Sequence, residues 1–158
     1  GLHTMTGGRI KRIQPYIDNE PFMTYGDGVC DVNISDLIAF HKKHGKIATL
    51  TAVIQKQQKG VLDIAESGSV KSFREKQTND GAAINAGFMV LQPDIFQYLQ
   101  DGDATIFETK PLECLVQEGQ LMSYSHSGFW QCMDNAREKE MLEKIWESGK
   151  APWKVWED

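Results

Sequence analysis

The chain has 158 residues, 41% of them hydrophobic and 25% charged, which is enough to bury a core without disulfides or metals. Its net charge of -5 argues against a general nucleic-acid-binding protein, because affinity for a phosphate backbone needs a basic surface. No apolar run approaches the ~20 residues of a membrane span, and we identify no signal peptide. We therefore expect one domain over residues 1–158, with no nucleic-acid or membrane partner.

The cysteines Cys30, Cys114 and Cys132 are odd in number and lack Cys-X-X-Cys spacing. This pattern gives no sign of a disulfide framework or a zinc knuckle. A reducing cytoplasm is the simplest setting for such a chain.

The first predicted element is a short amphipathic helix whose apolar spacing starts at Ile10, with Thr6 as its cap. Two glycines stand beside this helix start, where free backbone N–H groups favour an anion, and Arg9 would add further donors. The alternative is a capped surface helix whose basic residues are solvated.

Residues 21–28 end an apolar run in an acid between two glycines, Gly26-Asp27-Gly28. Such a run predicts a buried strand that delivers the Asp27 carboxylate to the open edge of a sheet, where a metal or phosphate can bind. The glycines would allow a ligand to approach the main chain closely. The alternative is that Asp27-Gly28 is only a turn dipeptide.

A second amphipathic helix is predicted from Ile34 and ends at Gly45. His41 and His44 stand three apart on it, and we interpret them as surface residues because no Cys or acid joins them at metal-ligand spacing. Residues 47–54 are β-branched and apolar, which predicts a strand covered on both faces. The order strand, helix, strand implies a right-handed crossover between parallel strands.

Residues 61–66 and 70–76 form a predicted β-hairpin around Ser67-Gly68-Ser69. Glu75 and Lys76 at its exit could hold a sugar hydroxyl and a phosphate, or could be ordinary solvated surface. The next strand, 82–91, is interrupted by Asn85 and Gly87, which indicates either a ligand-facing strand with a bulge or a structural amide.

The last third of the chain is predicted to hold a helix opened by Pro93, a helix over 107–116 and a strand over 121–126. Asp134 then follows the bulky pair Phe129-Trp130 as a second carboxylate. The tail from Asn135 is predicted to be helical, and its Trp-rich end to pack on the body.

Six motifs in order carry a resemblance to the glucose-1-phosphate cytidylyltransferases, a family of sugar nucleotidyltransferases, over essentially the whole chain. They are Thr4-Met5-Thr6-Gly7-Gly8-Arg9, Tyr25-Gly26-Asp27-Gly28, Phe73-Arg74-Glu75-Lys76, Ile84-Asn85-Ala86-Gly87-Phe88, Gly128-Phe129-Trp130-Gln131-Cys132-Met133-Asp134 and Gly149-Lys150-Ala151-Pro152-Trp153-Lys154.

The resemblance implies an α/β fold with a Rossmann-like mixed sheet of the nucleotide-diphospho-sugar transferase type, lacking the N-terminal strands. It implies a nucleoside triphosphate, here CTP, and a sugar 1-phosphate, glucose 1-phosphate, as substrates, and Mg²⁺ as cofactor. By the family pattern, Asp27 and Asp134 hold Mg²⁺. Lys76 meets the sugar phosphate, Glu75 and Asn85 face the sugar, and Thr6, Arg9 and Gly26 border the nucleotide. Gly87 is a further expected substrate-binding residue.

Family members also carry a glycine-rich Gly-X-Gly-Thr-Arg loop around the triphosphate, and no such loop occurs in residues 1–158. We therefore expect a C-terminal part that is inactive alone, with no catalytic residue of its own assigned. The alternative is a non-catalytic remnant that binds a sugar phosphate or self-assembles. Missing central strands would leave an open sheet edge, which predicts a homo-oligomer.

Overall fold

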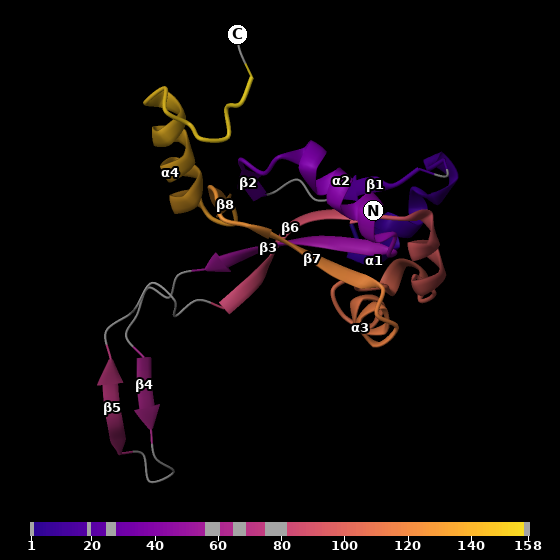
Figure 1. Cartoon of the computed structure of the whole chain (residues 1–158), viewed down its shortest axis with the longest axis horizontal. Helices are drawn as coiled ribbons and strands as arrows, with labels where there is room; N and C mark the ends of the chain where they lie inside the picture. The colour runs from indigo at the N-terminus through magenta and orange to yellow at the C-terminus, as the bar shows by residue number, and fades with distance from the viewer. Residues whose placement is uncertain are drawn as a thin grey trace.

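A four-stranded sheet forms the centre of the fold, seen here in a computed structural model that describes residues 2–18, 20–24, 28–55, 61–64, 69–74 and 82–156 (Figure 1). Its strand order is β1 (Phe22–Thr24), β6 (Ala82–Leu91), β3 (Ala48–Gln55) and β7 (Leu121–His126). β6 is antiparallel to both β1 and β3, whereas β3 is parallel to β7. The predicted mixed α/β sheet is therefore confirmed, and β1 and β3 point the same way with β6 between them.

Two small antiparallel sheets complete the strands. β2 (Gly28–Cys30) pairs with β8 (Trp130–Cys132), and β4 (Val61–Ile64) pairs with β5 (Val70–Arg74) as the predicted hairpin. In Figure 1 the β4–β5 hairpin extends away from the main sheet, while β2 and β8 lie beside one of its ends.

The helices are short. The main core lies between one face of the main sheet and the segments that cover this face. The α-helices are α1 (Thr6–Arg12), α2 (Ile34–His44), α3 (Lys110–Gln117) and α4 (Ala136–Glu147), and the 3₁₀ turns are η1 (Gln14–Tyr16), η2 (Pro93–Tyr98) and η3 (Gly102–Ala104). The main core cluster comprises Ile10, Ala48, Met89, Leu91, Ile95, Phe96, Leu99, Phe107 and Leu115. None of the helices in the described ranges has the length and apolar character needed to cross a bilayer.

Helix α2 follows its sequence signals closely. Asn33 caps it by accepting a hydrogen bond from the Asp36 N–H at 3.2 Å, and Gly45 ends it with φ of +63°. That left-handed conformation is one that glycine adopts without a Cβ clash.

Pro93 opens a helix as predicted, and it is a 3₁₀ helix over Pro93–Tyr98. Two local predictions are wrong. The helix expected from Phe107 begins at Lys110, because Phe107 is fully buried in the core instead. Thr6 does not cap α1: its hydroxyl accepts the Phe107 N–H at 3.0 Å and donates to Glu108 at 2.6 Å. The Thr6 side chain therefore ties α1 to the segment before α3.

The surface assignment of the two histidines is also wrong. His41 is 0% exposed, and its Nδ1 lies 2.8 Å from Thr49 Oγ1, while His44 Nε2 lies 2.7 Å from the same oxygen. Gln92 Nε2 is 3.0 Å from His41 Nε2. Uncharged partners on and beside the sheet thus satisfy the imidazoles, so no acid is needed, and the network fastens α2 to β3.

Burial lowers the pKa of His41 to about 4, with the neighbouring His44 as a second cause. An unfolded histidine titrates near 6.5, so the unfolded chain binds this proton more readily than the folded chain. The stability due to neutral His41 is therefore complete above about pH 6.5 and is lost as the pH falls toward 4.

We expect the unfolding free energy of His41→Gln to fall less than that of the wild type between pH 6.5 and 4. The two decreases should differ by about 1.4 kcal/mol for each unit that separates the folded and unfolded pKa values of His41. Urea unfolding at a series of pH values measures this. His3→Gln, which changes an exposed histidine, is the matched control and should keep the wild-type slope. Equal slopes for His41→Gln and wild type would contradict the assignment.

Candidate functional site

The β2–β8 pair joins the segments that carry the two predicted metal ligands. Its register places Gly28 opposite Cys132 and Cys30 opposite Trp130. Asp27 precedes Gly28 in the sequence but lies outside the described residues, and Asp134 follows β8. Gly28, which adjoins Asp27, and Cys132, two residues before Asp134, are therefore cross-strand neighbours, while the separation of the two carboxylates stays a prediction.

The middle of β6 meets this pair. Trp130 Nε1 donates to the Ala86 carbonyl oxygen at 2.9 Å, and a Cβ built on Gly28 would lie 3.4 Å from the same oxygen. Asn85 and Gly87, two of the residues predicted to bind substrate, flank Ala86. The structure thus brings these two residues into the region of β2 and β8.

Gly87 is a bulge residue, as the interrupted strand pattern predicted. Its φ is +89°, and its N–H donates to Asn85 Oδ1 at 2.9 Å. Residues Ala86 to Phe88 of β6 lie opposite Thr51 alone, which shifts the register between β3 and β6. The bulge turns this stretch out of the regular ladder, and it leaves Asn85 exposed with a partly satisfied amide.

Asp134 is exposed and lies at the start of α4. Its backbone N–H donates to Glu138 Oε2 at 2.8 Å, and Cys132 Sγ lies 3.6 Å from Glu138 Oε1. Asn135, the N-cap of α4, holds the Glu138 N–H at 3.1 Å. Ligand atoms of Cys132, Asp134 and Glu138 all lie within 4.8 Å of one another.

The charges of this group suit a hard cation. Burial, with the contacts to Asp134 and Glu138, raises the pKa of Cys132 to about 11, so the thiol stays protonated at neutral pH. The Asp134 N–H is the main cause that lowers the pKa of Glu138 and keeps it ionised. Mg²⁺ prefers carboxylate oxygens with water and phosphate oxygens completing its octahedron, so the exposed Asp134 and the half-buried Glu138 carboxylates fit it and the thiol does not.

Glu138 is a candidate residue that the sequence interpretation missed. The signal was available, because Asn135-X-X-Glu138 has the spacing of a helix capping box just before an amphipathic stretch. Here the Glu138 carboxylate satisfies the Asp134 N–H, one residue before the cap.

Thr6 and Arg9 lie elsewhere. α1 packs on η3, where Met5 N–H donates to the Asp103 carbonyl at 2.8 Å and Gly8 N–H to the Thr105 carbonyl at 3.2 Å. In Figure 1, α1 and α4 lie at opposite ends of the main sheet. The structure therefore does not bring these two residues to Asp134.

The two glycines of α1 serve packing. Gly7 and Gly8 are buried inside the helix, and a Cβ on Gly7 would lie 2.5 Å from Thr105 Cγ2. Arg9 is exposed and its Nε donates to the Thr4 carbonyl at 3.0 Å.

Gly26, Asp27, Glu75 and Lys76 lie outside the described residues, and their roles stay predictions. Glu75 directly follows β5, so the sugar-phosphate pair of the motif is attached to the exit of the β4–β5 hairpin.

Comparisons with known proteins agree with this architecture. Residues 8–158 match the family model described as "Nucleotidyl transferase". Over 159 residues the chain is 54% identical to the glucose-1-phosphate cytidylyltransferase of Salmonella typhi, covering 99% of this chain and 61% of that protein. It is 33% identical over 145 residues to the mannose-1-phosphate guanyltransferase of Saccharomyces cerevisiae, covering 87% of this chain and 39% of that protein.

Among solved structures, HddC from Yersinia pseudotuberculosis has a TM-score of 0.65 at 23% identity, covering 90% of this chain and 63% of HddC. This likeness supports the nucleotide-diphospho-sugar transferase fold. The chain spans about three fifths of the Salmonella relative it matches. Because the family model covers nearly all of the sequence, this chain belongs to the nucleotidyl transferase family.

Proposed function

We propose that this chain forms part of a glucose-1-phosphate cytidylyltransferase, which converts CTP and glucose 1-phosphate into CDP-glucose and pyrophosphate. The 54% identity to the Salmonella typhi protein of that name supports this choice of reaction. The observation that carries it is the pairing of Gly28 with Cys132, since Gly28 directly follows Asp27 and Cys132 stands two residues before Asp134.

The reaction asks for positioning and charge neutralisation more than for covalent catalysis. A sugar-phosphate oxygen forms a bond to the α-phosphorus of the triphosphate as the bond to pyrophosphate breaks, without an enzyme-bound intermediate. Asp27 and Asp134 would hold Mg²⁺, with the Glu138 carboxylate beside Asp134. When bound, Mg²⁺ supplies neutralisation of phosphate charge.

The remaining roles divide between sugar and nucleotide. We assign Lys76 to the sugar phosphate and Glu75, Asn85 and Gly87 to the sugar, and the exposed Asn85 beside the β6 bulge supports an approach of the sugar there. Thr6, Arg9 and Gly26 are assigned to the nucleotide border by the resemblance. The odd number of cysteines, without Cys-X-X-Cys spacing, is the reason for proposing a reducing cytoplasmic setting.

We expect Asp27→Asn and Asp134→Asn each to weaken binding of a divalent cation by about tenfold or more, because each removes a charged oxygen ligand. Paramagnetic Mn²⁺, which takes the same oxygen donors, allows the free ion to be counted by electron paramagnetic resonance. Asp94→Asn, at an exposed acid on η2, is the matched control. Wild-type affinity in Asp134→Asn would exclude the metal role of that residue.

The 158-residue chain alone is expected to release no pyrophosphate from CTP, glucose 1-phosphate and Mg²⁺, because it contains no Gly-X-Gly-Thr-Arg loop for the triphosphate. A coupled pyrophosphate assay measures this. Steady turnover that Asp27→Asn abolishes would overturn the expectation.

Calorimetry with glucose 1-phosphate tests the sugar-phosphate site separately: Lys76→Ala should weaken binding, and Lys43→Ala, at an exposed lysine of α2, should not.

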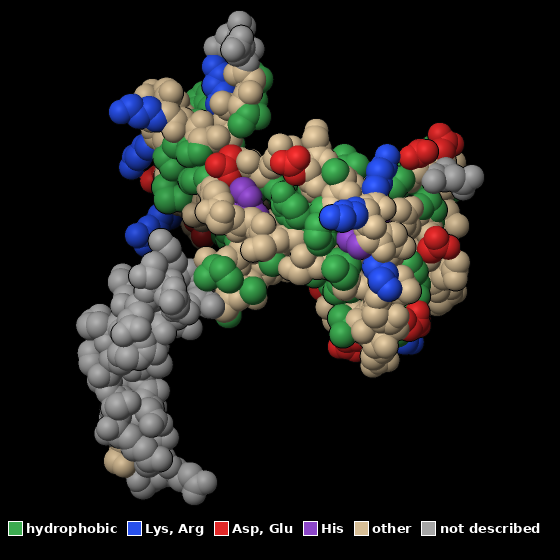
Figure 2. Space-filling model, viewed as in Figure 1, with side chains coloured by type: hydrophobic (Ala, Val, Ile, Leu, Met, Phe, Trp, Pro, Cys, Tyr) green, Lys and Arg blue, Asp and Glu red, His purple; other side chains and the backbone are tan. Residues whose placement is uncertain are grey.

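We also expect the chain to self-associate. β1 and β7 are the outer strands of the main sheet in the described part of the chain, and open edges invite strand pairing. Trp146 and Trp156 add exposed aromatic surface at 48% and 53%, and green side chains gather over α4 in Figure 2. Light scattering across a concentration series should show mass rising above the monomer, and a constant monomer mass would contradict this.

A further inference from the structure

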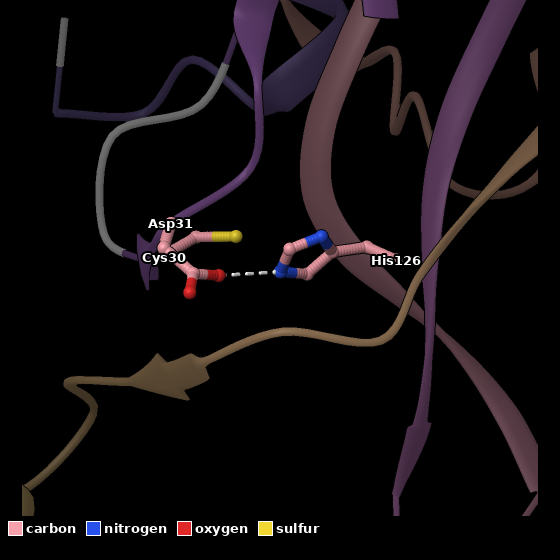
Figure 3. A group of neighbouring side chains, drawn as sticks. All are labelled: Cys30, Asp31 and His126. Atoms are coloured by element: carbon pink, nitrogen blue, oxygen red, sulfur yellow. Dashed lines mark ion pairs between the residues drawn. The ribbon is translucent and has the colours of Figure 1, made fainter. Parts of the chain in front are cut away.

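A second cluster of possible metal ligands lies where β2 ends and β7 ends. Figure 3 shows the Cys30 thiol and the Asp31 carboxylate both directed at the imidazole of His126, the last residue of β7. One ligand atom from each residue lies within 4.8 Å of the other two. The side chains are sheltered, with His126 11% and Asp31 26% exposed.

The contact between Asp31 and His126 is close but poorly aligned. Asp31 Oδ1 lies 2.9 Å from His126 Nε2, yet this buried oxygen accepts no properly oriented hydrogen bond from the described residues. His126 Nε2 also lies 3.3 Å from the Phe129 carbonyl oxygen. A buried carboxylate oxygen without a hydrogen bond is costly, and it would repel an unprotonated Nε2 at this distance. Either a shared proton or a shared cation removes that repulsion.

The backbone leaves room for these groups to converge. A Cβ on Gly128 would overlap Asp31 Oδ1 and lie 2.8 Å from His126 Cε1, so a larger residue would push the two apart. Among the described residues, the Cys30 sulfur accepts one hydrogen bond, from the Val32 N–H at 3.3 Å. Sulfur is a weak hydrogen-bond acceptor, so the Val32 contact leaves lone pairs of the Cys30 sulfur available to bind a cation.

We propose that Cys30, Asp31 and His126 bind a divalent d-block cation of the Zn²⁺ type, which links β2 to β7. One sulfur, one nitrogen and one oxygen are the donors that Zn²⁺ accepts in tetrahedral sites, whereas Mg²⁺ disfavours sulfur and nitrogen. Bonds of about 2.0–2.3 Å require the three side chains to close slightly around the ion. The thiol proton passes to solvent as the metal–sulfur bond forms, and water or the Phe129 carbonyl completes the tetrahedron.

This site is distinct from the carboxylates of Asp134 and Glu138. Its ligands are softer and more sheltered, and its role would be to fix the strand that begins directly after Asp27. The inference does not rest on the proposed transferase activity.

The test is titration of the chelator-treated 158-residue chain with Co²⁺, which reports its own ligands by absorption. We expect one equivalent to give the visible bands of a tetrahedral site and a near-ultraviolet thiolate-to-cobalt band, and Zn²⁺ to displace it. Cys30→Ala should remove the thiolate band and weaken binding by at least about tenfold. Asp31→Asn should also weaken it. Cys114→Ala, at another partly buried cysteine, is the matched control and should change nothing.

Several results would overturn the site. One is cobalt binding without a thiolate band in the wild-type chain, a measurement that needs no variant to fold. Others are unchanged binding in Cys30→Ala, or loss of the band in Cys132→Ala instead. Asp134→Asn should leave the cobalt spectrum intact while it weakens Mn²⁺ binding, so failure of this site and failure of the proposed Mg²⁺ site are distinguishable. Circular dichroism of each variant confirms that it is folded.

Discussion

The antiparallel pairing of β2 with β8 is the constraint on which the candidate site depends. Each strand has only three residues, and an isolated two-stranded ribbon is at best marginally stable. Its position is therefore set by contacts with the main sheet and the loops around it. Trp130 Nε1 fixes β8 to the Ala86 carbonyl, and the Asp31 N–H fixes the end of β2 to the Phe129 carbonyl at 3.2 Å. Any change that frees these contacts would move the segments that carry both acids.

Two groups of metal-ligand side chains of different chemistry lie at the ends of these two strands. At the exit of β8, the exposed Asp134 and the half-buried Glu138 offer carboxylates beside a thiol whose pKa is raised, a setting for a hard cation among phosphates and water. At the exit of β2, Cys30 and His126 offer sheltered sulfur and nitrogen. A hard cation such as Mg²⁺ would therefore prefer the carboxylates of Asp134 and Glu138, and a softer cation such as Zn²⁺ would prefer the group of Cys30 and His126, because the two groups differ in donor type and in access to water.

The sequence was sufficient where the signal is local or continuous. The β-branched run of β3, the apolar run of β6 and the Gly87 bulge all form as predicted, because each is written in consecutive residues. It was insufficient where a distant partner decides. Burial of His41 depends on Thr49 and Gln92, the late start of α3 depends on the place of Phe107 in the core, and Thr6 is drawn away from capping by Phe107 and Glu108. Three-residue strands such as β2 and β8 carry almost no periodicity, so their register could not be predicted.

β6 shows how one strand serves both stability and the site. Its residues pass from exposed at Ala82 to fully enclosed at Met89–Leu91, and the bulge at Gly87 lies between these two environments. Beyond the enclosed end, Gln92 joins the His41 network that fastens α2 to β3. At the bulge, the Ala86 carbonyl oxygen accepts a hydrogen bond from Trp130 Nε1 of β8. The bulge interrupts the β3–β6 ladder between Asn85 and Met89, so the two ends of β6 are not joined by one continuous ladder. Loss of the His41 network at the Gln92 end should therefore reduce overall stability. The backbone around Ala86 should keep its shape in the molecules that remain folded.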